Sequence, residues 1–324
     1  MKILNFNSKV ALAPMAGITD LPMRKMITSF VAPDKQMPII FSEMVAINAI
    51  NRRNPKTYRI ADVRGEAYPV IVQLVGGEPE LFSEAVKLAE ELGAYSIDIN
   101  MGCPVGKIVR NNSGCELMKK PKVAAKIIES CVKASPLKVS VKFRKGWDNN
   151  HINAVEFAKM CEESGASFVS LHGRTRSQLY SGQADWDIIA EVKQAVKIPV
   201  IGNGDITSPQ KAKAMLDYTN ADAVMIGRGA LGSPWLISQT EEYLQTGIEP
   251  TESSRSFIKQ TLIAHIKELV AYYGERLAIP ISRKYVCWYC KNMLSARKFR
   301  ENYMKITTFQ AAEEEIENFF TDTD

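Results

Sequence analysis

Eight short runs of mostly apolar, often β-branched residues recur along the chain, and amphipathic stretches separate them. Such runs are typical of parallel strands buried on both faces, whereas the intervening stretches place apolar residues at helical spacing. The alternation therefore indicates repeated strand–helix units. The runs are VALAP (10–14), PIIFSE (38–43), PVIVQL (69–74), YSIDIN (95–100), KVSVKF (138–143), SFVSLH (167–172), PVIGN (199–203) and DAVMIG (222–227).

Eight such units predict an α/β fold, a closed TIM (β/α)8 barrel. An open, doubly wound sheet is the alternative, although that fold more often has six strands and a GxGxxG motif after the first. The chain has 324 residues, more than one barrel needs, and helical patterns continue to its end. We therefore expect a barrel over residues 1–245 and a small all-helical domain over residues 246–324.

The predicted strands end in polar residues. A TIM barrel builds its active site from the C-terminal ends of its strands and the loops that follow, so these side chains are expected to meet at one mouth. So many polar groups at one mouth indicate a large ligand with many hydrogen-bonding edges, such as a flavin. They are Pro14-Met15-Ala16, Glu43, Gln73, Asn100, Lys142, His172, Asn203-Gly204-Asp205 and Gly227-Arg228.

Composition excludes several classes of protein. Hydrophobic residues make up 46% of the chain and charged residues 24%, which is typical of a globular protein. No apolar run reaches the length of a signal peptide core or of a membrane helix, so we expect a cytoplasmic protein. Six scattered cysteines do not form a disulfide framework, and three histidines leave no metal cluster, so no bound metal is expected.

Two sequence features predict how an anionic ligand is held. The glycines of GNGD (202–205) and Gly227 let backbone N–H groups approach a phosphate, and Arg228 adds positive charge. Lys142 lies in an apolar strand, where an ammonium group needs an anion or a cluster of carbonyls. We expect it beside the N1–C2=O edge of the flavin. The alternatives are a solvated Arg228 and a structural ion pair of Lys142 with Glu43 or Asp98.

Three further side chains are candidates for ligand or substrate binding. Gln73 and Asn100 are expected to hydrogen-bond the pyrimidine side of the flavin and the substrate, although both also serve as structural links in other proteins. His172, in LHGRTRSQ, is expected to hydrogen-bond flavin or substrate, with a packed core histidine as the alternative.

Cys103 is the candidate for proton transfer. It lies in INMGCPVGKIVRNNSG (99–114), on a loop that Gly102 and Pro104 stiffen. An ordinary thiol, with a pKa near 8.5, is mostly protonated at neutral pH and serves as a general acid. Reduction of the uracil C5=C6 bond needs a hydride at C6 and a proton at C5, which flavin N5 and Cys103 would supply. An inert, buried cysteine is the alternative.

Charge is distributed unevenly near the C-terminus. Residues 251–305 hold eleven Lys and Arg against four acidic residues, and residues 306–324 hold six acidic residues and no base. Tyr285, Trp288 and Phe299 interleave with the positive charge. Such a face binds RNA phosphates while its aromatic rings stack on bases. A solvated basic face over an aromatic core remains the alternative.

Six motifs, in this order, resemble those of the tRNA-dihydrouridine synthases, and the similarity spans nearly the whole chain. The motifs are APMAGITDLPMR, SEM, DINMGCP, HGRTR, GNGDIT and MIGR. The segments DYTNADAVMIGRGALGSPW and AHIKELVAYYG look most like the bacterial B branch. The resemblance implies an FMN-binding TIM barrel followed by a helical tRNA-binding domain, with NADPH as the reductant. No obligate protein partner is expected.

Site residues follow from the resemblance position by position. It implies that Cys103 is the proton donor. Arg283-Lys284-Tyr285 departs from the Arg-Lys-His that is frequent in the family, which affects RNA contacts rather than chemistry. FMN contacts are implied at Pro14, Met15, Ala16, Gln73, Lys142, His172, Asn203, Gly204, Asp205, Gly227 and Arg228. Contacts with uridine or RNA are expected at Asn100, Arg174, Arg176, Arg283, Lys284, Tyr285 and Trp288.

The resulting hypothesis is that reduced FMN, re-reduced by NADPH, reduces a flipped-out uridine in the D-loop of tRNA. A second hypothesis keeps the flavin and makes the substrate a free pyrimidine or a dihydroorotate-like molecule. A third is an RNA-binding protein whose barrel does not catalyse.

Overall fold

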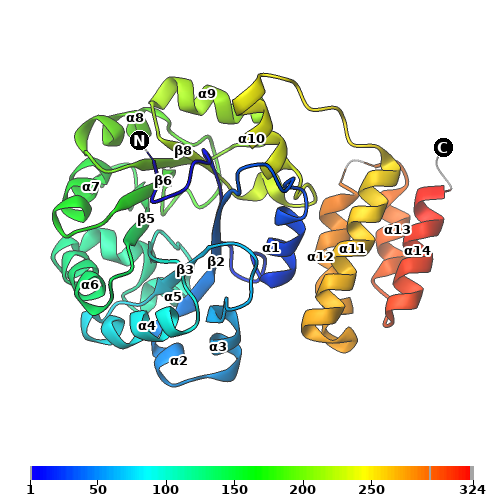
Figure 1. Cartoon of the computed structure of the whole chain (residues 1–324), viewed down its shortest axis with the longest axis horizontal. Coiled ribbons are helices and arrows are strands. Elements are labelled where there is room, and N and C mark those ends of the chain that lie inside the picture. Colours follow the sequence, from blue (N-terminus) through cyan, green and yellow to red (C-terminus); the bar gives the residue numbers. More distant parts are fainter. Residues whose placement is uncertain (1, 292, 322–324) are drawn as a thin grey trace.

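The computed structural model contains a closed barrel of eight parallel strands surrounded by helices (Figure 1). Each strand pairs with the next in the sequence, and β8 pairs with β1, which confirms the predicted TIM barrel. The structure describes residues 2–291 and 293–321. The strands are β1 (Val10–Leu12), β2 (Ile39–Ala46), β3 (Val70–Val75), β4 (Ser96–Met101), β5 (Val139–Gly146), β6 (Phe168–Thr175), β7 (Val200–Asn203) and β8 (Ala223–Ile226).

Helices cover the outside of the barrel and form the C-terminal part of the chain. In the barrel region they are α1 (Leu21–Thr28), α2 (Ile47–Asn51), α3 (Pro55–Ala61), α4 (Pro79–Glu91), α5 (Gly106–Arg110), α6 (Pro121–Ala134), α7 (Ala154–Glu163), α8 (Asp187–Ala195), α9 (Pro209–Thr219) and α10 (Leu236–Thr246), with short 3-10 helices η1 (Gly114–Lys119) and η2 (Arg228–Ala230). Beyond the barrel lie α11 (Arg255–Tyr273), α12 (Glu275–Tyr289), α13 (Ala296–Tyr303) and α14 (Phe309–Thr321).

Two apolar layers hold the barrel together. The inner layer fills the barrel with side chains such as Phe41, Phe168 and Met225, and Ile3 and Phe6 of the N-terminal segment pack against it. The outer layer lies between the strands and the surrounding helices. Because both faces of each strand are buried, the strands read as continuous apolar runs in the sequence.

Three strands extend three residues further than the sequence predicts, and the first of them, β2, ends at Ala46 rather than at residue 43. β5 continues to Gly146 and β6 to Thr175, with a register irregularity between them. His172 therefore lies within β6, and the prediction that it ends its strand is wrong, whereas Lys142 lies inside β5, as predicted. Gly146 pairs with Thr175 in the barrel wall, so the short apolar runs underestimate the strands at the active-site end.

The last four helices pack beside the barrel. Residues 247–254 connect α10 to α11 without helix or strand. α11 packs against α12 and α14, and it also contacts α1 of the barrel. Figure 1 shows these four helices as one group on the α1 side. The helical C-terminal region is as predicted, whereas a domain boundary at residue 245 stays a prediction.

Among the described residues, no helix combines the length and the apolarity that crossing a membrane would require.

Candidate active site at the C-terminal end of the barrel

A pocket of about 1120 Å³ opens at the C-terminal ends of the strands. Every residue predicted to contact the cofactor lines it, together with Asn100 and Cys103. The closed barrel brings these positions together, although they span residues 14 to 228, because all strand ends point to one rim. Their individual roles stay predictions.

A chain of amides runs along the floor of this pocket. Gln73 Nε2 donates to Asp98 Oδ2 at 2.7 Å, and Asn100 Nδ2 donates to Gln73 Oε1 at 2.8 Å. Asn100 Oδ1 in turn accepts the Cys103 N–H at 2.8 Å. Asp98 thus fixes the orientation of both amides and, through them, the start of the cysteine loop. Its burial raises the pKa of its carboxyl to about 6, although Gln73 and Ser140 donate to it.

Lys142 points into the pocket, where Asn203 is its hydrogen-bond partner. Lys142 Nζ donates to Asn203 Oδ1 at 3.1 Å. Burial lowers the pKa of Lys142 to about 8, Arg144 acts in the same direction, and Asp98 opposes them. An ammonium group has three N–H donors, and Asn203 uses one. The geometry does not favour the alternative of an ion pair with Glu43, whose carboxylate accepts the Gly17 N–H.

Cys103 lies half-buried on the loop after β4. Burial raises the pKa of its thiol, and this effect outweighs the Val105 N–H and the positive charges of Arg144 and Lys142, which lower it. The thiol is therefore neutral at physiological pH, which is the state that a general acid requires.

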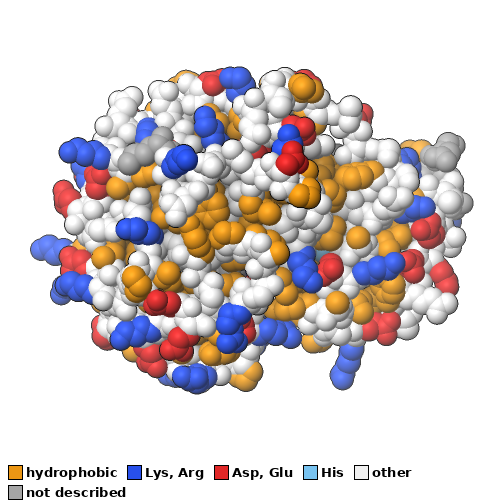
Figure 2. Space-filling model, in the orientation of Figure 1, with side chains coloured by type: hydrophobic (Ala, Val, Ile, Leu, Met, Phe, Trp, Pro, Cys, Tyr) orange, Lys and Arg blue, Asp and Glu red, His pale blue; other side chains and the backbone are white. Residues whose placement is uncertain are grey.

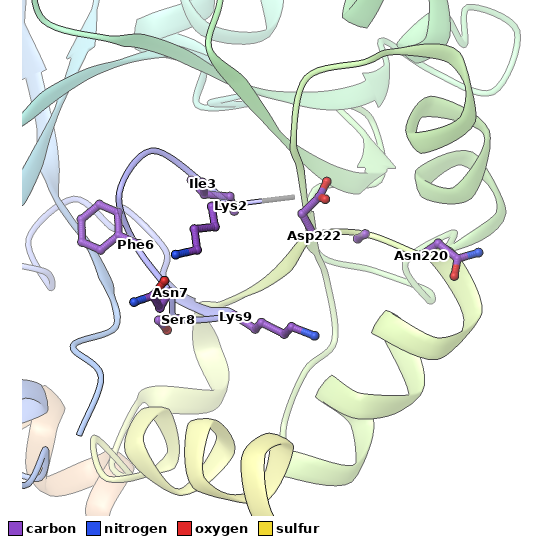
Figure 3. Close-up of a pocket in the computed structure, with 9 residues that line it drawn as sticks. Lys2, Ile3, Phe6, Asn7, Ser8, Lys9, Asn220 and Asp222 are labelled. Carbon is purple, nitrogen blue, oxygen red and sulfur yellow. The ribbon is translucent and has the colours of Figure 1, made fainter. Parts of the chain in front are cut away.

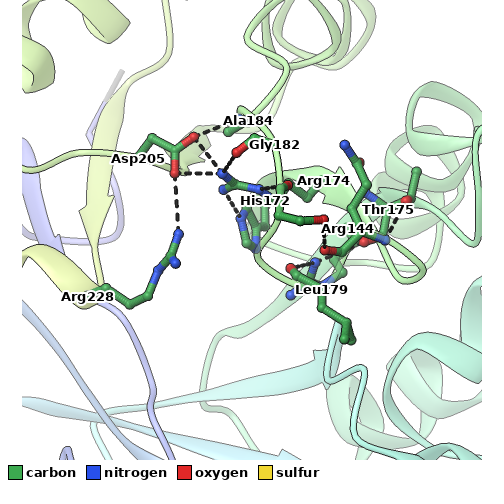
Figure 4. A network of polar contacts seen from close by, with 11 residues as sticks. Arg144, His172, Arg174, Thr175, Leu179, Gly182, Ala184, Asp205 and Arg228 are labelled. Carbon is green, nitrogen blue, oxygen red and sulfur yellow. Dashed lines mark hydrogen bonds and ion pairs between the residues drawn. The ribbon is translucent and has the colours of Figure 1, made fainter.

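Arg174 holds the carboxylate of Asp205 from inside the protein (Figure 4). Arg174 Nη2 donates to both Asp205 oxygens at 2.8 Å and to Gly182 O at 2.6 Å, while Nη1 lies 3.3 Å from His172 Nε2. Since a guanidinium only donates, His172 Nε2 must accept and the imidazole is neutral. Burial lowers the pKa of His172 well below its usual range, with Lys142 the next largest cause.

Arg174 is buried in this structure, and its contact with uridine or RNA stays a prediction. Its residue surface is 1% exposed, and its hydrogen bonds go to protein groups. Because Arg174 follows His172 by two positions on β6, both side chains lie on the same side of the strand, where Asp205 is available. The ion pair explains why an arginine tolerates this burial.

Arg144 is a site residue that the sequence interpretation missed. Its guanidinium donates to Gly102 O at 3.0 Å, Thr175 O at 2.9 Å and Leu179 O at 2.7 Å. It thereby joins the cysteine loop to the loop after β6. The signal was present, because Arg144 follows Lys142 by two positions and so shares its face of β5.

The ends of β7 and β8 form the glycine-rich part of the pocket. Gly204 has φ +138°, and a Cβ there would lie 2.4 Å from that of Ala184, so a side chain does not fit. Arg228 Nη2 lies 3.4 Å from Asp205 Oδ1, and about half of its side chain is exposed. Asp205 is thus bracketed by two arginines, which leaves this corner with net positive charge.

The four residues of α12 that are predicted to contact RNA differ in how far they are exposed. Tyr285 is 1% exposed and its hydroxyl donates to Ile18 O at 3.4 Å, and its contact with RNA stays a prediction. Trp288 is half-buried and packs edge-on against Tyr285. Arg283 donates to Ile306 O at 3.4 Å, and Lys284 donates to Gly17 O.

No continuous basic patch is visible on the face in Figure 2, where Lys and Arg alternate with Asp and Glu among the coloured residues. Arg176 packs over the Trp147 ring at 4.9 Å from its centroid, outside the pocket lining. RNA contacts at Arg176, Arg283 and Trp288 therefore stay predictions.

A second cavity, of about 390 Å³, lies at the opposite end of the barrel under the N-terminal segment (Figure 3). Lys2 and Lys9 line it from that segment, and Asp222 lies across from Lys2. Asp222 already pairs with Lys193 at 2.6 Å and accepts the Val200 N–H at 2.8 Å. This end of a TIM barrel usually serves stability, and these contacts agree with that role.

Comparison with known proteins identifies the family. The family described as "Dihydrouridine synthase (Dus)" matches residues 11–323. A "Probable tRNA-dihydrouridine synthase" of Rickettsia conorii is 44% identical over 98% of this chain and 95% of that protein. The "tRNA-dihydrouridine synthase B" of Pseudomonas aeruginosa is 38% identical over 97% of this chain and 93% of that protein.

Solved structures share the fold at low sequence identity. Histamine dehydrogenase from Rhizobium sp. 4-9 aligns with a TM-score of 0.57 and 13% identity, over 86% of this chain and 49% of that chain. Morphinone reductase aligns with a TM-score of 0.51 and 14% identity, over 78% of this chain and 90% of that chain. With a family match across nearly all of its length and relatives of similar length, the chain belongs to the dihydrouridine synthase (Dus) family.

Proposed function

We propose that this protein is a flavin-dependent tRNA-dihydrouridine synthase that reduces the C5=C6 bond of a D-loop uridine. The observation that carries the proposal is the half-buried thiol of Cys103 on the rim of a pocket that also holds Lys142, and burial raises the pKa of this thiol. The family match and the names of the relatives support the same reaction.

The pocket fits FMN as the flavin. Its volume of about 1120 Å³ accommodates an isoalloxazine ring together with a base. The net positive charge of the corner formed by Arg174, Asp205 and Arg228 suits the phosphate. Lys142 and Gln73 line the pocket and would present polar groups to the pyrimidine edge of the ring, where Lys142 would stabilise negative charge.

The chemistry adds one hydride and one proton to uracil. Lys142, Gln73 and Arg228 would hold the flavin, which, once reduced by NADPH, would supply the hydride that C6 requires. Cys103 donates its S–H proton to C5, and its thiolate afterwards takes a proton from water, so that charge and atoms balance. Asn100 holds the backbone N–H of Cys103, and Arg144 holds Gly102 O, so the loop presents the thiol in a fixed position.

A uridine must leave its stack to reach this thiol, because the reacting groups lie inside the barrel mouth. The helical region beside the mouth is the proposed tRNA-binding domain, and Arg283 and Arg176 remain candidates for phosphate contacts. Binding of this kind is steeply salt-dependent, because each neutralised phosphate releases counterions.

The test is an anaerobic reaction of purified holo-protein and NADPH with tRNA that lacks dihydrouridine. Mass spectrometry of nucleosides and fragments is expected to show a gain of two hydrogens at a D-loop uridine. The Cys103→Ala variant is expected to keep bound flavin and its reduction by NADPH but to lose most tRNA reduction.

Other outcomes of these measurements would favour an alternative function or refute the role of Cys103. No mass gain from protein whose flavin NADPH does reduce would favour a free pyrimidine or dihydroorotate-like substrate. A colourless protein that FMN does not reconstitute would favour a non-catalytic RNA-binding protein. Undiminished tRNA turnover in Cys103→Ala would refute the role of the thiol.

A further inference from the structure

The C-terminal helices contact the loop that forms one wall of the proposed flavin pocket. This loop, residues 13–20, connects β1 to α1 and is called the β1–α1 loop here. Pro14, Met15 and Ile18 are among its residues that line the pocket. The position of the wall therefore depends on what holds this loop.

Gly17, at the tip of the β1–α1 loop, is held by both of its backbone groups. The Glu43 carboxylate accepts its N–H, and Lys284 Nζ donates to its C=O. Glu43 belongs to β2, whereas Lys284 belongs to α12 beyond the barrel. Gly17 has φ +70°, a conformation that glycine adopts without strain, so its peptide groups are free to face these two side chains.

Two tyrosines of the C-terminal helices bind the same loop. Tyr273 Oη donates to Asp20 Oδ2 at 2.9 Å, and Tyr285 Oη donates to Ile18 O at 3.4 Å. Asp20 also caps α1, because its Oδ1 accepts the Met23 N–H at 3.1 Å. The helical region thus contacts the loop at its tip and at its junction with α1.

Charge makes Lys284 the central residue of this contact. Asp20 is 2% exposed and Glu43 is 6% exposed, and two buried carboxylates need cationic partners. Arg24 lies near both but is itself paired with Glu66 in a buried ion pair. Burial raises the pKa of both carboxylates, and the positive charge of half-buried Lys284 opposes this effect at each of them. Removal of Lys284 would leave the Asp20 and Glu43 carboxylates with less positive charge nearby.

We propose that Lys284 is a positioning residue for the flavin: by holding Gly17 against Glu43 it fixes the pocket wall formed by the β1–α1 loop. This inference rests on the proposed function in one respect, that the pocket binds FMN. It reassigns Lys284 from RNA contact to cofactor positioning. It also makes the helical region part of the flavin site, in addition to its proposed role in tRNA binding.

The experiment measures FMN binding without RNA. Full-length protein stripped of flavin is titrated with FMN, and the visible circular dichroism of the bound flavin is recorded. Loss of a charged hydrogen bond in Lys284→Met is expected to weaken FMN binding by about tenfold or more and to change the spectrum. Lys284→Arg, which keeps the charge and a donor, is expected to recover most of the affinity.

Lys298→Met is the matched control, because Lys298 is an exposed lysine of α13 in the same helical region. It removes the same charge and is expected to leave FMN affinity and the spectrum unchanged. If Lys284→Met does not fold, Tyr285→Phe replaces it, since it removes only the hydroxyl that binds Ile18 O. Its FMN affinity is expected to fall in the same direction, by a smaller factor.

Unchanged FMN affinity and spectrum in folded Lys284→Met would overturn the inference, and weaker tRNA binding in that variant would restore Lys284 as an RNA contact. Wild-type protein that does not bind FMN would instead refute the flavin part of the proposed function. Wild-type protein that binds FMN without reducing tRNA leaves the measurement on Lys284 intact.

Discussion

Replacement of Arg174 by methionine is expected to destabilise the protein and leave RNA electrostatics unchanged. The Arg174 side chain is 2% exposed and that of Asp205 is 29% exposed. Removal of one partner from a buried ion pair costs roughly 3–5 kcal/mol, because the other charge is left uncompensated. Asp205 keeps Arg228 and some contact with solvent, so we expect the lower end, about 3 kcal/mol.

Urea denaturation of Arg174→Met, Asp205→Asn and the double variant measures this energy in a double-mutant cycle. The coupling energy is expected to be at least about 1.5 kcal/mol, since the guanidinium bonds a carboxylate through two oxygens. Arg174→Lys is not expected to restore stability, because an ammonium group lacks the fork that also reaches Ser181 O and Gly182 O.

Arg64→Met is the matched control, because it breaks an arginine–aspartate pair with Asp62 on the surface. Its stability is expected to stay close to that of the wild type. The salt dependence of tRNA affinity in Arg174→Met is expected to equal that of the wild type, as the charge is buried. A coupling energy near zero, or a weaker salt dependence of tRNA affinity in Arg174→Met than in the wild type, would refute this reasoning.

Three further predictions concern single side chains. Alkylation of Cys103 by iodoacetamide, followed by peptide mass spectrometry, is expected to be slow at neutral pH. Its rate is expected to rise only at a pH above the usual pKa of a thiol, because burial raises the pKa of Cys103. Fast labelling at pH 7 would contradict this. Burial lowers the pKa of His265 to about 3 from 6.5, so the unfolded state binds more protons between these values, and stability is lost as pH falls through this window. Unfolding midpoints of the wild type should thus fall more steeply with acid than those of His265→Gln, and parallel curves would argue against it. Arg144→Met is expected to lower kcat by about 100-fold while flavin stays bound, because a displaced cysteine loop misplaces the thiol, and Arg144→Lys should not rescue it; single-turnover rates that match the wild type would exclude this positioning role.

The pocket lining was predictable because it depends on one topological rule. Once eight apolar runs are taken as parallel strands of a barrel, their C-terminal ends must meet at one rim, whatever their separation along the chain. Gln73, Lys142 and Arg228 therefore line one pocket, as expected. No contact between individual side chains had to be known for that inference.

Arg174 and Tyr285 have partners in the fold that the sequence does not predict. An arginine or tyrosine in a polar segment suits solvent, RNA or a buried partner equally well, and the choice depends on what lies opposite. Arg174 meets Asp205, which is 31 residues away, and Tyr285 meets Ile18, which is 267 residues away. Contacts between residues so far apart in the chain are not visible in any local stretch of the sequence.

The sequence by itself determined the period of the elements, and hence the barrel, its rim and the candidate thiol, because burial on both faces of a strand leaves a direct trace in residue order. Only the tertiary structure decided the partners of the buried charges: Arg174 with Asp205, Arg144 with the carbonyls of two loops, and Lys284 with Gly17. The physical reason is that a buried charge is stabilised by whichever groups the fold brings within a few ångströms, and chain separation does not enter that energy.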